Sequence, residues 1–256
     1  MIGADLTGTT YVVVAAGSAA GARTAQMLST RGAHLVLAGR DAAALAPLAA
    51  SVGGQIVTAD AANFADVERC VAEAIAATGR LDGIVNCAGS ILLKPAHLTS
   101  AQELQEVLAA NLVSAFATVR AAAGAMRQAG GSIVLVSSAA AAIGLPNHEA
   151  IAAAKAGVSG LTRSAAATYA PYGIRVNAVS PGLVDTPMSR PITSNELARK
   201  ASVAMHPLGR LGTADDIAEA VCWLLTPHSA WVTGQIIGVD GGLATLKSRS
   251  KTDGRS

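Results

Sequence analysis

Short, continuous apolar runs alternate with longer Ala-rich segments of helical periodicity along most of the chain. A short apolar run bounded by Gly, Asn, Asp or Ser is typical of a strand buried on both faces. The runs predict seven strands, at Tyr11–Ala15, His34–Ala38, Gln55–Thr58, Gly83–Val85, Ser132–Val136, Arg175–Val179 and Ile236–Val239. Helices are predicted between them, near 21–31, 42–50, 64–78, 100–126, 149–169 and 214–225.

Strands that alternate with helices predict a parallel sheet covered by helices on both faces. We therefore predict an α/β fold, a doubly wound Rossmann-type sheet in a single domain over residues 1–246, with ligands beyond the carboxyl ends of the strands. The alternation breaks at 183–212, which contains prolines and a short helical pattern around Asn195–Met205. We interpret this segment as a substrate lid, the alternative being a non-functional insertion. The polar, basic residues 247–256 predict a disordered tail.

Composition narrows the class of protein. Of the 256 residues 51% are hydrophobic and 14% charged, with a net charge of +2, so no clustered basic face for nucleic acid is expected. The longest apolar stretches, such as Ala139–Ile143, are far shorter than a membrane span. Three widely spaced cysteines predict neither disulfides nor a metal site, and the amino-terminal segment lacks a basic region. These features predict a cytoplasmic protein without metal, membrane or nucleic acid.

A glycine-containing loop follows the first strand and opens a helix. Gly17 allows a tight turn, and Gly21 lets a pyrophosphate approach the free N–H groups of the first helical turn. The spacing differs from the common G-x-G-x-x-G pattern, and a purely structural glycine turn is the alternative. In the first position of an α/β alternation, we interpret the loop as a phosphate-binding site.

The second strand is followed by Arg40 and Asp41, some twenty residues beyond the glycine loop. An acidic side chain here would bind the adenosine ribose, whereas a guanidinium would pair with a 2′-phosphate. Arg40 therefore predicts NADP(H) in preference to NAD(H). Two alternatives stay open: Asp41 binds the ribose while Arg40 is a surface residue, or Asp41 only caps the next helix.

Further motifs fall in a fixed order after these strands: Gly17-x-x-x-Gly21, Asp60, Asn86-Cys87-Ala88-Gly89, Asn111, Ser138, Lys155, Pro181-Gly182, Thr186 and Asp240-Gly241-Gly242. Over about residues 8–245 the chain resembles the short-chain dehydrogenase/reductase family. The resemblance implies contacts to four parts of the cofactor. These are the pyrophosphate (Gly17, Ser18, Gly21, Ala22), the adenine (Asp60, Ala61), the adenosine side with its ribose (Asn86, Ala88, Gly89) and the nicotinamide end (Pro181, Gly182, Thr186).

Two residues depart from the family pattern inside these motifs. Arg23 stands where the family has a third loop glycine, and it either crowds the helix or adds positive charge near the pyrophosphate. Cys87 replaces the second asparagine of the Asn-Asn-Ala-Gly stretch. We predict a small buried residue there rather than a reactive thiol.

The resemblance also implies catalytic roles. Family members use an asparagine that holds a water, a serine that orients the substrate oxygen, a tyrosine that is the general acid or base, and a lysine that lowers the tyrosine pKa and binds the nicotinamide ribose. Asn111, Ser138 and Lys155 match three of these positions. The tyrosine position, four residues before the lysine, is Ile151, which can neither donate nor accept a proton. None of the three tyrosines has a lysine four residues later.

Three hypotheses follow. The first is an NADP(H)-dependent oxidoreductase for a carbonyl or alcohol substrate, in which His148 replaces the tyrosine; Glu149 points away from the Ile151 face. The bland alternative is that Asn147 caps the helix while His148 is an ordinary first-turn residue. The second hypothesis is a catalytically impaired NADP(H)-binding sensor or subunit. The third, a lyase or isomerase on the same scaffold, has no specific support.

The sequence indicates the substrate and the assembly only coarsely. Substrate-pocket walls are expected from Ser90–Ala96, Ala139–Pro146 and 183–210, whose small or apolar residues favour an apolar carbonyl compound. The resemblance implies a homo-oligomer, a tetramer or a dimer. The Ala-rich helices 100–126 and 149–169 suit close helix pairing between copies.

Overall fold

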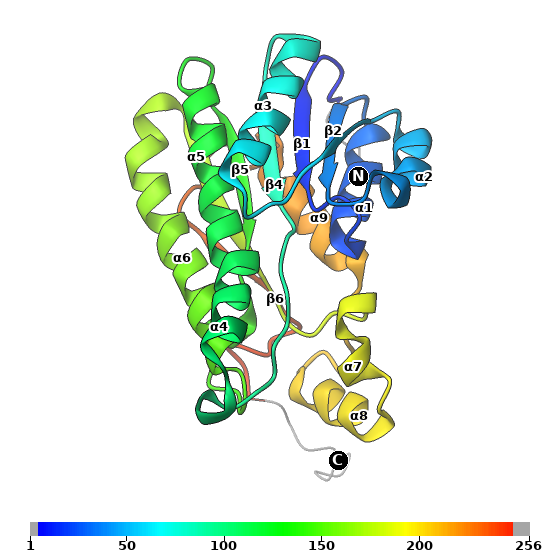
Figure 1. Ribbon diagram of the computed structural model, residues 1–256, viewed down its shortest axis with the longest axis vertical. Coiled ribbons are helices and arrows are strands. Elements are labelled where there is room, and N and C mark those ends of the chain that lie inside the picture. The colour runs from blue at the N-terminus through cyan, green and yellow to red at the C-terminus, as the bar shows by residue number, and fades with distance from the viewer. Residues whose placement is uncertain (1–4, 248–256) are drawn as a thin grey trace, which may run out of the picture.

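The computed structural model describes residues 5–247 and contains one seven-stranded parallel sheet, as predicted (Figure 1). Its strand order is β3-β2-β1-β4-β5-β6-β7. The chain therefore winds outward from β1 in one direction and then outward from β4 in the other, which places a topological switch point between β1 and β4. The strands are β1 Thr10–Val14, β2 His34–Gly39, β3 Gln55–Thr58, β4 Gly83–Asn86, β5 Gly131–Val136, β6 Ile174–Pro181 and β7 Ile236–Val239.

Helices form a layer on each face of the sheet, with α1, α2 and α9 on one side and α3, α5 and α6 on the other (Figure 1). Their side chains meet the alternating side chains of the strands in two separate cores, because successive residues of a strand point to opposite faces. Val12 of β1 belongs to the core under α3 and α5, and its neighbour Val13 belongs to the core under α1 and α9. The helices are α1 Ala19–Ser29, α2 Ala42–Val52, α3 Phe64–Thr78, α4 Ala101–Leu108, α5 Ser114–Met126, α6 Glu149–Tyr169, α7 Arg190–Thr193, α8 Glu196–Met205 and α9 Ala214–Leu225.

The predicted helix 100–126 is interrupted in the structure. A π-helical segment, Ala109–Val113, joins α4 to α5 and carries Asn111. Ser100 begins α4 with a capping box to Glu103. The whole stretch Ala101–Met126 is long and apolar enough to cross a membrane by length and composition, but 56% of its most apolar window is buried inside the molecule. It is a core helix of the fold.

The excursion at 183–212 contains two short helices, α7 and α8, below the α1 and α9 layer in Figure 1. Asn195 caps α8 by accepting a hydrogen bond from the Ala198 N–H group. No residue of α8 is buried, so this helix packs on the rest of the molecule only loosely. Of the predicted tail 247–256, all but Lys247 lies outside the described residues, as do residues 1–4.

Candidate functional site

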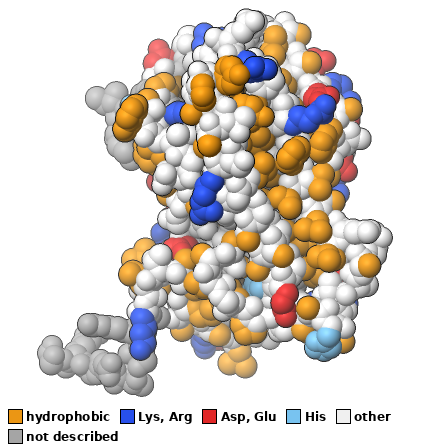
Figure 2. Space-filling model, turned by 90° about the vertical axis from the view of Figure 1, so that its left-hand side faces the viewer, with side chains coloured by type: hydrophobic (Ala, Val, Ile, Leu, Met, Phe, Trp, Pro, Cys, Tyr) orange, Lys and Arg blue, Asp and Glu red, His pale blue; other side chains and the backbone are white. Residues whose placement is uncertain are grey.

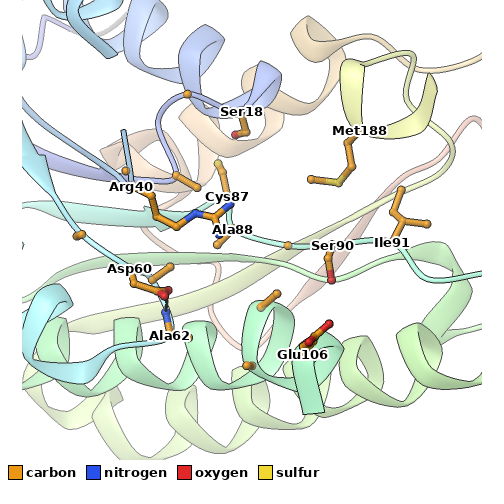
Figure 3. A pocket seen from close by; sticks show the side chains of 18 of the residues that line it. Ser18, Arg40, Asp60, Ala62, Cys87, Ala88, Ser90, Ile91, Glu106 and Met188 are labelled. Carbon is orange, nitrogen blue, oxygen red and sulfur yellow. Dashed lines mark hydrogen bonds between the residues drawn. The ribbon is translucent and has the colours of Figure 1, made fainter. Parts of the chain in front are cut away.

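A cavity of about 800 Å³ opens at the carboxyl ends of β1 to β4, at the switch point of the sheet. Met188 from the 183–212 segment and Glu106 from α4 face it from opposite sides (Figure 3). The residues that line it are Ala15, Gly17, Ser18, Gly39, Arg40, Asp41, Ala44, Leu45, Ala59–Ala62, Cys87–Leu92, Glu103, Glu106, Val107, Ala109, Ala110 and Met188. Seven of the predicted cofactor residues are among them: Gly17, Ser18, Arg40, Asp60, Ala61, Ala88 and Gly89.

The glycine loop holds the amino terminus of α1 against the end of β1. Ser18 is the N-cap residue of α1, and its Oγ accepts a hydrogen bond from the Gly21 N–H group at 3.1 Å. A Cβ on Gly21 would lie 2.7 Å from the Ala15 carbonyl oxygen, closer than carbon and oxygen can approach, so only glycine fits there. A Cβ on Gly17 would meet nothing nearer than Leu45 Cδ2 at 3.5 Å. The loop thus uses Gly21 for packing and leaves Gly17 open toward the cavity.

Arg40 and Asp41 have different surroundings at the end of β2. Asp41 Oδ1 accepts a hydrogen bond from the Ala44 N–H group at 3.1 Å, which makes it the N-cap residue of α2. Arg40 is exposed and forms no hydrogen bond or ion pair with another residue in the described range 5–247. Its side chain extends into the cavity (Figure 3). The carboxylate is therefore engaged by its own helix, whereas the guanidinium is free for a ligand.

The segment after β4 shapes the middle of the cavity. Asn86 is buried; its Oδ1 accepts a hydrogen bond from the Ala88 N–H group at 2.8 Å and its Nδ2 donates to Ser114 Oγ at 3.2 Å. Asn86 therefore fixes the loop and is not a lining residue. Cys87 lines the cavity wall, and burial raises the pKa of its thiol to about 12, which keeps it protonated at neutral pH.

Two of the predicted catalytic residues, Asn111 and Lys155, lie close together beside Gly89. A Cβ on Gly89 would lie 2.9 Å from Asn111 Oδ1 and 3.5 Å from Lys155 Nζ. Lys155 Nζ donates to the Val136 carbonyl oxygen at 2.7 Å, at the end of β5, and Ser138 follows two residues later. Burial lowers the pKa of Lys155 to about 8.

Asn111 is held by several hydrogen bonds in the π-helical segment. Its Nδ2 donates to the Val107 carbonyl oxygen at 2.9 Å, and its Oδ1 accepts from the Ser90 N–H group at 3.3 Å. Ser138 is half-buried, and its Oγ accepts a hydrogen bond from the Ala140 N–H group at 3.2 Å. The hydroxyl hydrogen of Ser138 has no acceptor among the described residues, so it is free to donate.

His148 and Ile151 lie on the amino-terminal side of Lys155. Ile151, one helical turn before the lysine, is 5% exposed and packs in a small apolar cluster with Val107 and Ala154. His148 Nδ1 lies 2.7 Å from the Pro146 carbonyl oxygen, and His148 does not line the cavity. Asn147, the N-cap residue in the expected alternative, has a left-handed φ of 62° and forms no side-chain cap of α6, so that alternative is wrong.

The predicted nicotinamide end lies outside the larger cavity. Pro181 ends β6, and the Gly182 N–H group donates to the Val239 carbonyl oxygen at 3.2 Å. Gly182 lines a second cavity of about 320 Å³ beside β7. The Thr186 N–H group donates to Ser189 Oγ at 3.0 Å.

His206 is a residue of this region that sequence reasoning missed. It is 3% exposed; its Nε2 accepts from the Leu183 N–H group at 3.1 Å and its Nδ1 donates to the Ser202 carbonyl oxygen at 2.6 Å. A Cβ on Gly182 would lie 2.6 Å from His206 Nε2, so glycine is required there. His206 thereby fastens α8 to the segment after β6. A single histidine in a loop carries no sequence signal for such a contact.

Other expectations met a different outcome. Arg23 forms an ion pair with Asp215 of α9 and donates to Gln26 Oε1, so it neither crowds α1 nor points at the glycine loop.

Of the expected substrate walls, Ser90–Leu92 and Met188 line the cavity, and no residue of 139–146 does. The α4 residues Glu106 and Val107 were not expected there. Within residues 5–247, no group of three or more His, Cys, Asp or Glu side chains is placed to hold a metal ion.

The strand order, the glycine loop and the cavity at the switch point define a doubly wound, Rossmann-type protein. The profile of a family described as enoyl-(acyl carrier protein) reductase matches residues 14–244. The 2,5-dichloro-2,5-cyclohexadiene-1,4-diol dehydrogenase of Sphingobium indicum is 36% identical over 248 residues, which cover 94% of this chain and 99% of that protein. A protein described as inactive 2-(S)-hydroxypropyl-CoM dehydrogenase 2, of Xanthobacter autotrophicus, is 38% identical over 224 residues, 84% of this chain and 96% of that one.

A solved short-chain type dehydrogenase/reductase from Mycobacterium ulcerans has the same fold, with a TM-score of 0.90 and 30% identity over 95% of this chain and 92% of that chain. The chain therefore belongs to the short-chain dehydrogenase/reductase family, whose oxidoreductases use nicotinamide cofactors.

Proposed function

We propose that this protein is an NADP(H)-dependent oxidoreductase that interconverts an alicyclic alcohol and the corresponding ketone. The observation that carries the cofactor assignment is the contrast at the end of β2. Asp41 caps α2, while Arg40 extends unpaired into the cavity. A 2′-phosphate would find a guanidinium there, and a bare ribose would find a carboxylate that already accepts a backbone hydrogen bond.

The residues fit a dinucleotide along the whole switch point. The open loop at Gly17 and the amino terminus of α1 would hold the pyrophosphate, since free N–H groups there favour an anion. Asp60 and Ala61 would hold the adenine, and Ala88 and Gly89 the adjoining ribose. The remaining assignments are carried over from the family resemblance: Gly21, Ala22 and Asn86 beside these groups, and Pro181, Gly182, Thr186 and Lys155 at the nicotinamide end. When bound, the cofactor supplies or accepts a hydride.

The substrate class rests on the lining near the catalytic residues. Ile91, Leu92 and Met188 make this end of the cavity apolar, and a relative with almost full coverage is described as a dehydrogenase of a cyclic diol. An apolar ring fits such walls, and its one reacting oxygen would be oriented by the free hydroxyl hydrogen of Ser138. We propose that the segment 183–212 forms a lid over this end, with Met188, two residues before α7, in contact with the cavity.

A second candidate function has its own support. Ile151 removes the tyrosine hydroxyl that the family resemblance implies, and one relative is described as inactive. A catalytically impaired NADP(H)-binding sensor or subunit would keep the cofactor residues and lose turnover.

Two measurements test these proposals. Fluorescence titration with NADPH and NADH should show tighter binding of NADPH, and this preference should vanish in Arg40→Ala. Turnover of cyclic ketones with bound NADPH should separate the enzyme from the sensor. Binding without turnover for the wild type, together with gained turnover for Ile151→Tyr, would favour the second candidate. Failure to bind either nucleotide would refute both.

We also propose that this protein forms a homo-oligomer. On the face turned to the viewer in Figure 2, apolar side chains lie among scattered Lys, Arg, Asp and Glu side chains. Phe116 of α5 is 50% exposed and stacks on Phe64. A second copy packed against α5 would bury that ring, and light scattering would give the number of copies. The cytoplasmic location stays a prediction.

A further inference from the structure

We propose that Lys155 is itself the proton donor to the substrate oxygen during carbonyl reduction, and the proton acceptor during alcohol oxidation. This inference rests on the proposed function, because it assigns the acid and base of the same reaction. The family resemblance implies that the lysine binds the nicotinamide ribose and lowers the pKa of a tyrosine; here Lys155 would in addition transfer the proton itself.

The ammonium group of Lys155 has free N–H bonds close to the cavity. Lys155 Nζ uses one N–H bond to donate to the Val136 carbonyl oxygen at 2.7 Å, and the other two have no acceptor among residues 5–247. Nζ lies 3.5 Å from the place where Gly89, a cavity residue, would carry a Cβ. Ser138, the residue expected to orient the substrate oxygen, follows Val136 by two residues in the chain. A donor with free N–H bonds therefore lies next to the proposed reacting end of the cavity.

The neighbouring side chains are less suited than Lys155 to donate a proton. Ile151 has no proton to give, and its side chain is packed against Val107 of α4. His148 Nδ1 lies 2.7 Å from the Pro146 carbonyl oxygen, so one of its two ring nitrogens is already engaged by the backbone. Burial raises the pKa of Cys87 to about 12, too high for efficient proton transfer near neutral pH.

The acidity of Lys155 suits proton transfer near neutral pH. Burial lowers its pKa to about 8, so the group is mostly protonated at neutral pH and yet acidic enough to give up a proton. Cys87, at the end of β4, is the titratable side chain that acts on it electrostatically. The polar groups near its Nζ are the Asn111 amide of the π-helical segment and the Val136 carbonyl of β5, which do not titrate in this range.

The chemical step balances without a further reactant. In reduction, the carbonyl carbon accepts a hydride from the reduced nicotinamide, and its oxygen becomes an alkoxide. One N–H bond of Lys155 breaks, an O–H bond forms on that oxygen, and a neutral amine remains. The amine then takes a proton from water. In oxidation the neutral amine removes the proton of the alcohol while the hydride leaves to the oxidised nicotinamide.

The central experiment is Lys155→Arg, because a guanidinium keeps the positive charge and N–H donors but does not give up a proton near neutral pH. We expect NADPH to bind within about threefold of the wild type. The rate of ketone reduction at saturating NADPH should fall by about 10²–10⁴-fold, the usual effect of a general acid. Lys247→Arg, an exposed lysine near the carboxyl terminus, is the matched control and should leave both quantities unchanged.

The pH profile of the wild type gives a second, independent measurement. Because the acid must be protonated, the reduction rate should be constant at lower pH and fall by about tenfold per unit above about pH 8. Oxidation should show the opposite limb, rising up to that pH. Trace labelling of Lys155 with acetic anhydride, read by mass spectrometry, should give the same pKa without using activity, even if Lys155→Arg does not fold.

The outcomes separate the inference from the proposed function. Near-wild-type reduction by a folded, NADPH-binding Lys155→Arg, or a labelling pKa that differs from the kinetic one by more than a unit, would overturn the role of Lys155. Loss of the alkaline limb in His148→Ala would assign the acid to His148 instead. A wild type that binds NADPH but turns over no ketone would refute the proposed function, and the proton-donor role with it.

Discussion

Two glycines of the cofactor loop are expected to respond to the same substitution in opposite ways. In Gly21→Ala the new methyl carbon would lie 2.7 Å from the Ala15 carbonyl oxygen and 2.8 Å from Ser18 Oγ. Both are far inside van der Waals contact, and the first belongs to the backbone, so the start of α1 must move. In Gly17→Ala the nearest atom is Leu45 Cδ2 at 3.5 Å, an ordinary contact.

The expected magnitudes follow from these contacts. Overpacking of this kind costs about 1–3 kcal/mol, and displacing the Ser18 cap adds about 0.5–2 kcal/mol. Gly21 lies within α1, where alanine is favoured over glycine by about 1 kcal/mol, so we expect a net loss of about 0.5–4 kcal/mol in unfolding free energy. For Gly17→Ala the stability should change by no more than about 0.5 kcal/mol.

Urea unfolding and NADPH titration together test this reasoning. Gly21→Ala should lower the unfolding midpoint. Gly17→Ala should keep the midpoint but weaken NADPH binding by about tenfold, because its methyl group adds to the wall proposed to contact the pyrophosphate. Wild-type stability of Gly21→Ala would refute the packing argument. Unchanged NADPH affinity of Gly17→Ala, measured in a variant of normal stability, would refute the phosphate assignment.

Three further predictions concern charged side chains. Arg40→Ala should weaken NADPH binding by about 10–100-fold, the equivalent of one charge-assisted contact, and leave NADH binding unchanged in the same fluorescence assay. Arg23→Ala should cost at most about 1 kcal/mol in urea unfolding, because Arg23 and Asp215 are both about half exposed, and should not affect either nucleotide. The hydrogen bonds from Lys94 lower the pKa of Glu103 from 4.5 to about 2, so this contact stabilises the fold above pH 4.5 and is lost as the pH falls toward 2. Glu103→Gln should flatten that part of the acid unfolding profile.

The elements of the fold could be predicted because strands buried on both faces of a sheet appear in the sequence as continuous apolar runs. All seven predicted strands are present, with ends that differ by at most two residues, and helices 64–78, 149–169 and 214–225 have the predicted bounds. The π-helical segment at Ala109–Val113 was not predicted, because its wider turn does not disturb the apolar pattern. Its effect is local and places Asn111 against Ser90.

Strand order alone predicts those site residues that come soon after a strand. Gly17, Arg40 and Asp60 each stand just after the carboxyl end of a strand, so strand order alone brings them to one cavity. Glu106 lies on α4 and His206 directly follows α8, and their positions depend on how these helices pack, which local sequence does not encode. The ion pair of Arg23 could not be predicted either, because its partner Asp215 lies 192 residues away in the chain.

Ile151 occupies the expected tyrosine position, and its side chain is buried in an apolar cluster. With Ala150 and Ala154 it forms an apolar cluster apart from the two main cores, closed by Val107 of α4 and Leu92 of the cavity wall. A phenol in place of Ile151 would have to enlarge this cluster or extend past it toward Lys155, and overpacking typically costs about 1–3 kcal/mol. Ile151→Tyr should therefore be less stable than the wild type in urea while its reduction rate rises, because the added hydroxyl gives a second proton donor. A tyrosine variant that is fully stable yet no faster would show that the phenol packs away from the cavity, and that position 151 acts on packing alone.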